Sequence, residues 1–151
     1  ISIAHKVIYE QLTLNVGVSY IGRYNQFHED EDELQEFLYS PEANFNATYS
    51  LRQPNITFAL FYKHTGAVEQ YVFDSEINDF RKGKTNSFNW LDYTTTWRPT
   101  DHISIQGGVK NILNLTDINT TSGTAGAHSD APVNVGLTYG RSYFLRLGYT
   151  F

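Results

Sequence analysis

Four basic side chains are the groups best suited to binding an anionic ligand: Arg23, Lys63, Lys110 and Arg146. Each lies in a stretch where polar and apolar residues alternate, and each falls on the polar side of that alternation. If these stretches are strands, the four cations line one face of a sheet, where they guide or repel charged solutes. We take Arg23, Lys110 and Arg146 as the candidate ligand-binding residues, and the alternative is that they pair with carboxylates.

Acidic residues and histidines suggest two further kinds of site. Five consecutive carboxylates, Glu29 to Glu33, follow His28. Hard oxygen ligands suit calcium, but this run lacks the glycine and the ligand placement of an EF-hand loop. His64, His102 and His128 are candidate haem ligands, yet they lie on separate segments without a spacing rule. We therefore expect a solvated acidic loop, no metal site and no cofactor.

Catalysis has little support in the sequence. No Ser-His-Asp arrangement, glycine-rich phosphate loop or paired-carboxylate motif is visible, so we expect a protein that is not an enzyme. The absence of cysteine excludes disulfides and thiolate chemistry. A net charge of -5 gives no support to a nucleic-acid partner. Because methionine is also absent, Ile1 is not a natural start, and we expect a processed product or a fragment.

The candidate residues lie on segments with a two-residue period, which is typical of β-strands. The alternation from Leu12 to Tyr24 runs for about thirteen residues, well beyond the five or six of a usual strand. The last stretch places Tyr143, Leu145, Leu147, Tyr149 and Phe151 on one side, with Phe144 as a large apolar exception on the other. Seven strands are predicted, at residues 3–9, 12–24, 43–51, 56–63 with an extension towards 73, 87–97, 103–110 and 139–151.

The connections between these segments alternate in length. Short turns are predicted at 10–11, 52–55 and 98–101, and long polar segments at 26–42, 74–86 and 114–138. Alternation of short periplasmic turns with long extracellular loops is typical of bacterial outer-membrane barrels. The aromatic content of 15% suits the girdles of such a barrel. We assign six residues to these girdles: Trp90, Trp97, Tyr20, Tyr62, Tyr93 and Tyr149.

Two segments resemble a known family. The stretch 106–114, Gln-Gly-Gly-Val-Lys-Asn-Ile-Leu-Asn, resembles the penultimate-strand signature of TonB-dependent outer-membrane receptors, and 139–151 resembles their final strand. The segment 18–24, Val-Ser-Tyr-Ile-Gly-Arg-Tyr, is similar to another strand of that family. The resemblance covers the whole chain in topology and about a third of it in motif.

The resemblance implies an all-β fold, an antiparallel transmembrane β-barrel of 22 strands, with this chain supplying about the last seven. It implies residence in the bacterial outer membrane, contact with lipid, and uptake of a siderophore-iron complex, haem, cobalamin or a glycan. The plug domain and the segment that engages the TonB energising system would lie outside residues 1–151. The barrel-assembly machinery would recognise Tyr143, Leu145, Leu147, Tyr149 and Phe151.

Two alternatives stay open from the sequence. A small eight-stranded outer-membrane barrel of structural or adhesion type fits the length, and it predicts that 1–9 pairs with 139–151. A soluble β-sandwich binding module predicts that the hydrophobic faces pack between two sheets.

Overall fold

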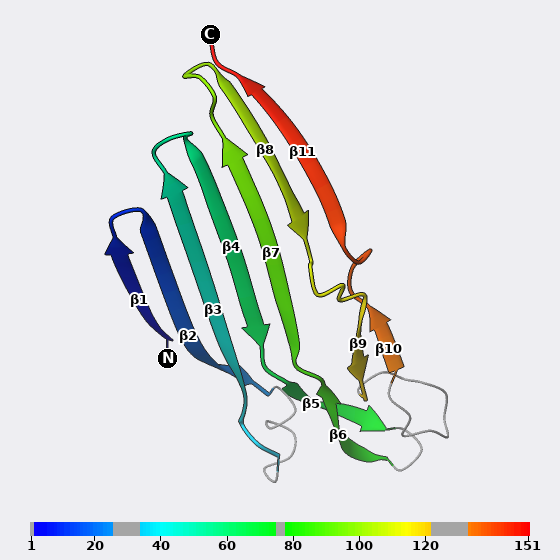
Figure 1. The fold of residues 1–151 in the computed structure, drawn as a ribbon. Helices are drawn as coiled ribbons and strands as arrows, with labels where there is room; N and C mark the ends of the chain where they lie inside the picture. Colours follow the sequence, from blue (N-terminus) through cyan, green and yellow to red (C-terminus); the bar gives the residue numbers. More distant parts are fainter. Residues whose placement is uncertain (1, 26–33, 75–77, 122–132) are drawn as a thin grey trace.

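In the described part of the chain, the regular secondary structure is all β-strand. The structure, a computed structural model, describes residues 2–25, 34–74, 78–121 and 133–151. These residues form eleven strands in two antiparallel sheets and no helix (Figure 1). Within them, no helix has the length and apolar character needed to cross a membrane.

The large sheet contains seven strands, in the order β1-β2-β3-β4-β7-β8-β11. These are β1 (Ser2–Tyr9), β2 (Leu12–Tyr24), β3 (Phe37–Leu51), β4 (Ile56–Thr65), β7 (Phe88–Trp97), β8 (Ile103–Lys110) and β11 (Ser142–Tyr149). A strand lies at each of the seven predicted positions, but the expected extension of 56–63 towards 73 is wrong, because β4 ends at Thr65 and Val68–Asp74 is a strand of another sheet. The sheet is open, because β1 pairs with β2 and β11 pairs with β8, at opposite edges.

The register gives the large sheet one apolar face and one polar face. In antiparallel pairing, directly opposed residues point to the same side. The row Val16, Phe45, Tyr62 and Leu91 crosses four strands on one side, which we call the apolar face. The next row, Asn15, Asn46, Phe61 and Asp92, lies on the other side, which we call the polar face. The two-residue alternation of the sequence is therefore realised across the sheet.

Short turns and long connections lie at opposite ends of the large sheet (Figure 1). The turns at 10–11, 52–55 and 98–102 occupy one end, where the β11 strand also finishes. Asn55 takes a positive φ of 61° in the second turn, a conformation that asparagine tolerates better than most residues. The predicted segregation of connections by length is confirmed.

The long connections contain a second sheet, which the sequence did not predict. Its strands are β5 (Val68–Asp74), β6 (Asp79–Thr85), β9 (Asp117–Thr120) and β10 (Val133–Gly136), in the order β10-β9-β6-β5. The predictions of a polar connection at 74–86 and of a stretch with little order at 114–138 are therefore partly wrong. The two connections pair with each other at Thr85 and Thr120, whose hydroxyl oxygens are 3.1 Å apart.

The small sheet also carries an ion pair. Lys82 Nζ lies 2.7 Å from Glu69 Oε2, across the β5–β6 hairpin. The hydrogen bond to Glu69 raises the pKa of Lys82 above its usual value. Because both side chains are well exposed, the pair contributes little to stability.

Strand β3 begins earlier than the sequence suggested. The long polar segment was predicted to run to residue 42, yet β3 starts at Phe37 and passes through Pro41. The regular β3–β4 register ends at Glu42, one residue after Pro41. Proline has no N–H to donate to Gly66 O, and the Ser40 hydroxyl donates to that carbonyl instead, at 3.2 Å.

One aromatic residue lies on a different face from the one expected. Trp90 is opposite Lys63, on the polar face, whereas Tyr62 and Leu91 share the apolar face. The assignment of Trp90 to an interface girdle is therefore wrong, because residues of opposite parity on one strand point to opposite sides. Trp97, by contrast, is aligned with Ile56 and Ile105 on the apolar face.

Candidate functional site

The polar face carries an open cavity of about 300 Å³ at the level of β3, β4, β7 and β8. The register brings polar groups from consecutive strands into this area, since Asn46, Phe61 and Asp92 lie in one row. Hydroxyl groups border the same space, and one aromatic ring contributes an apolar wall. The polar-face lining residues are Asn46, Thr48, Ala59, Phe61, Asp92, Thr94 and Lys110.

An ion pair forms the charged part of this cavity. Lys110 Nζ lies 3.0 Å from Asp92 Oδ2, and Asp92 Oδ1 accepts a hydrogen bond of 2.8 Å from the Asn111 backbone N–H. The Asp92 side chain is only 12% exposed, whereas that of Lys110 is 51% exposed. An ammonium group has three donors, so Lys110 retains hydrogen-bonding capacity toward a ligand while Asp92 fixes its position.

The other predicted basic residues lie elsewhere on the polar face. Arg146 is opposite Gln106 on β8, and Arg23 is opposite Leu38 towards the end of β2. Lys63 Nζ lies 3.3 Å from Glu42 Oε2. The structure therefore brings Lys110 to the cavity but does not gather the four cations into one site. Lys63 and Lys110 instead pair with carboxylates of neighbouring strands.

A network of hydrogen bonds joins the two ends of the 111–141 connection beside this cavity. Asn111 is 1% exposed and has a positive φ of 54°. Its side-chain amide donates to Leu115 O at 2.7 Å and to Thr138 Oγ1 at 3.1 Å, and its Oδ1 accepts from Leu115 N at 2.9 Å. The buried side chain of Asn111 thus forms hydrogen bonds with residues near both ends of the connection.

Arg141 adds hydrogen bonds to this network from the other end of the connection. Its guanidinium donates two hydrogen bonds to Ile112 O, at 3.0 and 2.6 Å. Its backbone N–H donates to Asn114 Oδ1 at 3.0 Å. The segments 106–114 and 139–151, which carry the family resemblance in the sequence, therefore contact each other directly. The residues of the sequence motif therefore join the two ends of this connection by hydrogen bonds.

The two candidate haem-ligating histidines in the described part of the chain, His64 and His102, lie at opposite ends of the large sheet. His64 Nδ1 lies 2.8 Å from Asn89 Oδ1, near the long-connection end of β4. His102 Nδ1 lies 3.0 Å from Thr150 O, at the short-turn end. His128 and the acidic run from His28 to Glu33 lie outside the described residues. Among the residues that are described, no three histidine or acidic side chains group as metal ligands.

The predicted assembly residues form an exposed row on the apolar face of β11. Tyr143, Leu145, Leu147 and Tyr149 are opposite Val109, Gly107, Ile105 and Ile103 of β8. Leu145 and Leu147 are 74% and 72% exposed. Tyr149 contacts the Phe151 ring edge-on, with the ring centroids 5.1 Å apart. The row therefore offers apolar side chains together with an edge strand, which suits recognition by strand pairing.

Two residues of the site were missed in the sequence. Asp92 is the partner of Lys110. The sequence signal that could have identified it is a charged residue at a polar-face position in the middle of a predicted strand. Asn111 lies inside the quoted 106–114 motif, but its burial depends on the contact with Thr138, 27 residues later.

Comparisons with models of protein families, with curated proteins and with solved structures find no match to the chain. The features that bear on function are therefore the two faces of the large sheet, its open edges and the ends at which its connections gather.

Proposed function

We propose that this chain forms part of the wall of a TonB-dependent outer-membrane receptor that imports a scarce nutrient. The observation that carries the proposal is the exposed apolar face of the seven-stranded antiparallel sheet. The apolar face meets outer-membrane lipid, and the polar face lines the lumen. The remaining strands of the barrel, the plug and the segment that engages the TonB system belong to parts of the protein outside these residues.

The exposed area supports a partner for the apolar face. A compact protein of 17.3 kDa exposes about 7,800 Å². This chain exposes 10671 Å², roughly a third more. Leu38 is the one apolar side chain that is buried among the described residues. Many large hydrophobic side chains of the apolar face are exposed, and such a surface is suited to contact with acyl chains.

The spacing of aromatic residues supports a membrane setting. Tyr39 and Tyr49 lie on the apolar face of β3, ten residues apart, which corresponds to about 33 Å along a strand. A tilt of about 40° reduces this span to about 25 Å, the height of the apolar band of an outer-membrane barrel. At the long-connection end of the sheet, Tyr20 stacks on Tyr39 with the ring centroids 5.1 Å apart.

The two alternative architectures fit the structure less well. An eight-stranded barrel requires β1 to pair with β11, yet these strands occupy opposite edges of the sheet. A β-sandwich requires a second sheet over the apolar face, yet the small sheet lies at the long-connection end (Figure 1). Val16, Leu145 and Leu147 are exposed on the apolar face.

The polar cavity and the long connections supply the ligand-facing surface of the receptor. Lys110, held by Asp92, offers donors toward anionic or carbonyl groups of an imported compound. Siderophore-iron complexes, haem, cobalamin and glycans all present such groups. The barrel-assembly machinery reads the β11 row through Tyr143, Leu145, Leu147, Tyr149 and Phe151.

The test is made on the full-length protein in its own membrane. We expect it to be extracted from the outer membrane by detergent and to change its gel mobility on heating. We also expect its deletion to abolish growth on one scarce source among siderophore-iron, haem, cobalamin and glycan. Recovery in the aqueous phase without a heat-dependent shift would overturn the proposal.

A further inference from the structure

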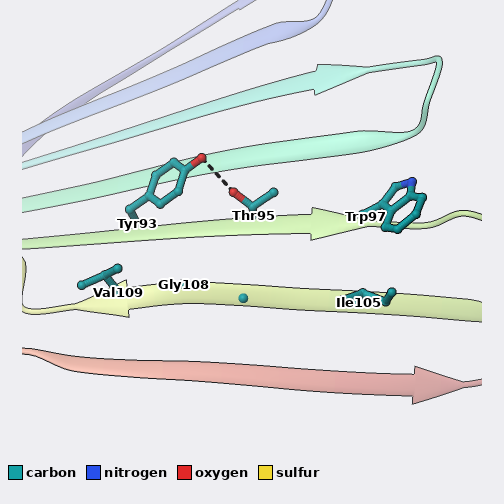
Figure 2. A pocket seen from close by; sticks show the side chains of 7 residues that line it. Tyr93, Thr95, Trp97, Ile105, Gly108 and Val109 are labelled. Carbon is teal, nitrogen blue, oxygen red and sulfur yellow. Dashed lines mark hydrogen bonds between the residues drawn. The ribbon is translucent and has the colours of Figure 1, made fainter.

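The apolar face contains a groove of about 340 Å³ between β7 and β8. Figure 2 shows Tyr93, Thr95 and Trp97 along one side and Ile105, Gly108 and Val109 along the other. The groove runs along the strands for the length of four residues, about 13 Å. Its lining residues therefore follow the strand direction on the open surface of the sheet.

The groove exists because a glycine replaces a side chain on the apolar face. Gly107 lies opposite Thr95 on β7 and Leu145 on β11, between the larger Ile105 and Val109 of its own strand. A Cβ at this position would have its nearest contacts at 3.6 Å and 3.7 Å, which are ordinary van der Waals distances. Backbone packing therefore does not require glycine here, and a larger side chain would simply fill the groove.

The groove has an apolar lining because its hydroxyl groups bond to each other. Thr95 Oγ1 donates to Tyr93 Oη at 2.8 Å (Figure 2). An alkyl chain can lie against this surface without leaving that donor of Thr95 unpaired. The ring of Tyr93 and the indole of Trp97 flank the two ends, where they add large apolar contact area.

Basic residues lie at the short-turn end of the groove. Arg98 follows Trp97 directly in the turn at 98–102. Its backbone N–H donates to Asn55 O at 3.0 Å, and this bond joins the turn at 98–102 to the turn at 52–55, which carries Arg52. Both arginines are exposed, and Asp101 is the acidic residue of the same turn as Arg98. Guanidinium groups form strong paired hydrogen bonds with phosphate. This end therefore complements an anionic headgroup.

We propose that the groove binds one acyl chain of a phospholipid from the leaflet at the short-turn side, with the lipid phosphate against Arg98 and Arg52. The inference rests on the proposed membrane setting of the apolar face. It adds a specific lipid site to a surface that otherwise makes only general contact with lipid.

Fluorescence quenching of Trp97 tests the site in the full-length protein reconstituted into vesicles. The difference between the native protein and Trp97→Phe isolates the signal of this indole. Brominated phosphatidylglycerol quenches tryptophan at contact and is titrated against unbrominated lipid. Brominated diacylglycerol, which lacks the phosphate, is the control probe.

We expect brominated phosphatidylglycerol to reach half-maximal quenching at about a tenfold lower lipid fraction than brominated diacylglycerol. One strong hydrogen-bonded contact with the phosphate accounts for a difference of this size. Gly107→Leu should remove this preference, and Gly107→Ala should reduce it. Arg98→Gln combined with Arg52→Gln should abolish the difference between the two lipids. Ala47→Leu, on the apolar face away from the groove, should change nothing.

The outcomes separate the two proposals. Equal, proportional quenching by both lipids in the native protein and in Gly107→Leu would overturn the lipid site and leave the membrane setting intact. Absence of quenching of Trp97 by either lipid would overturn both. Heat-dependent gel mobility confirms folding of each variant, and Gly107→Ala serves if Gly107→Leu does not assemble.

Discussion

At the residue scale, Ser40 shows how the chain accommodates a proline inside a strand. Gly66 N donates to Pro41 O at 2.7 Å, but Pro41 has no N–H to return the bond. The Ser40 hydroxyl instead donates to Gly66 O at 3.2 Å. Ser40 is fully buried, so no water can take its place. The hydroxyl therefore substitutes for the missing backbone donor.

This arrangement predicts the effect of removing one oxygen. Ser40→Ala leaves the carbonyl of Gly66 without a donor in a buried place, and it should lower the free energy of unfolding by about 1–2 kcal/mol. Denaturant titration of the full-length protein in detergent, followed by gel mobility, measures the change. Ser40→Thr keeps the hydroxyl and serves as the control. A loss below about 0.3 kcal/mol would contradict the account.

Asn111 gives a second prediction at this scale. Asn111→Ala removes three hydrogen bonds and places alanine at a positive φ, so the free energy of unfolding should fall by about 3 kcal/mol. Asn111→Gly tolerates that φ and should cost about 1 kcal/mol less. The same denaturant titration measures both variants. Equal losses for alanine and glycine would show that the backbone conformation contributes nothing.

Some residue roles could be predicted from sequence and others could not. Alternation assigned Leu145 and Arg146 to opposite faces, because side-chain direction follows from position along one strand. The pairing of Lys110 with Asp92 depends on the register between β7 and β8, which a single strand does not encode. The role of Ser40 depends on Gly66, 26 residues later, for the same reason.

At the element scale, the two adjacent glycines of β8 serve different purposes. A Cβ on Gly108 would lie 2.8 Å from the ring of Phe144 and even closer to Tyr93 O. The ring of Phe144 thus covers Gly108 on the polar face, which explains the apolar exception in the alternation of β11. A Cβ on Gly107 meets no such contact.

These contacts predict a matched pair of variants. Gly108→Ala should shift the backbone of β7 or displace Phe144, and it should lower the free energy of unfolding by about 2 kcal/mol. Gly107→Ala should change it by less than about 0.5 kcal/mol. Thermal unfolding monitored by circular dichroism compares the two. A larger loss at Gly107 than at Gly108 would contradict the register of β7, β8 and β11.

The second element-scale prediction concerns the joined connections. Thr85 and Thr120 are directly opposed, and Thr121 N donates to Lys84 O at 2.9 Å in the same contact. Thr85→Cys combined with Thr120→Cys should form a disulfide under mild oxidation, since opposed strand residues have a suitable Cβ separation. Mass spectrometry of tryptic peptides detects the link. Thr85→Cys with Thr116→Cys, which are not opposed, should remain reduced.

The elements of the large sheet were predictable because each strand carries its own two-residue pattern. The small sheet was not, since β9 has four residues and its contact with β6 joins positions 35 residues apart. Short strands rich in threonine and asparagine also match the composition of loops. Their pairing becomes visible only when both connections are seen together.

At the scale of the whole molecule, the seven strands form an open curved wall and not a closed body (Figure 1). Both edges, β1 and β11, have a free side in the described part of the chain. Free strand edges and a large apolar face each require a partner. In the membrane setting that we propose, further strands at the edges and lipid on the apolar face would meet both needs together, as in an outer-membrane barrel.

The central claim is that the apolar face of the large sheet meets lipid. Single nitroxide labels at positions 142 to 149 of β11, in the full-length protein reconstituted into vesicles, test it most directly. Collisions with dissolved oxygen report lipid, and collisions with a nickel chelate report water. We predict that labels at 143, 145, 147 and 149 favour oxygen, whereas labels at 142, 144, 146 and 148 do not. Labels at 145 and 147 that collide with the nickel chelate as readily as those at 144 and 146, or that are shielded from both reagents, would contradict it.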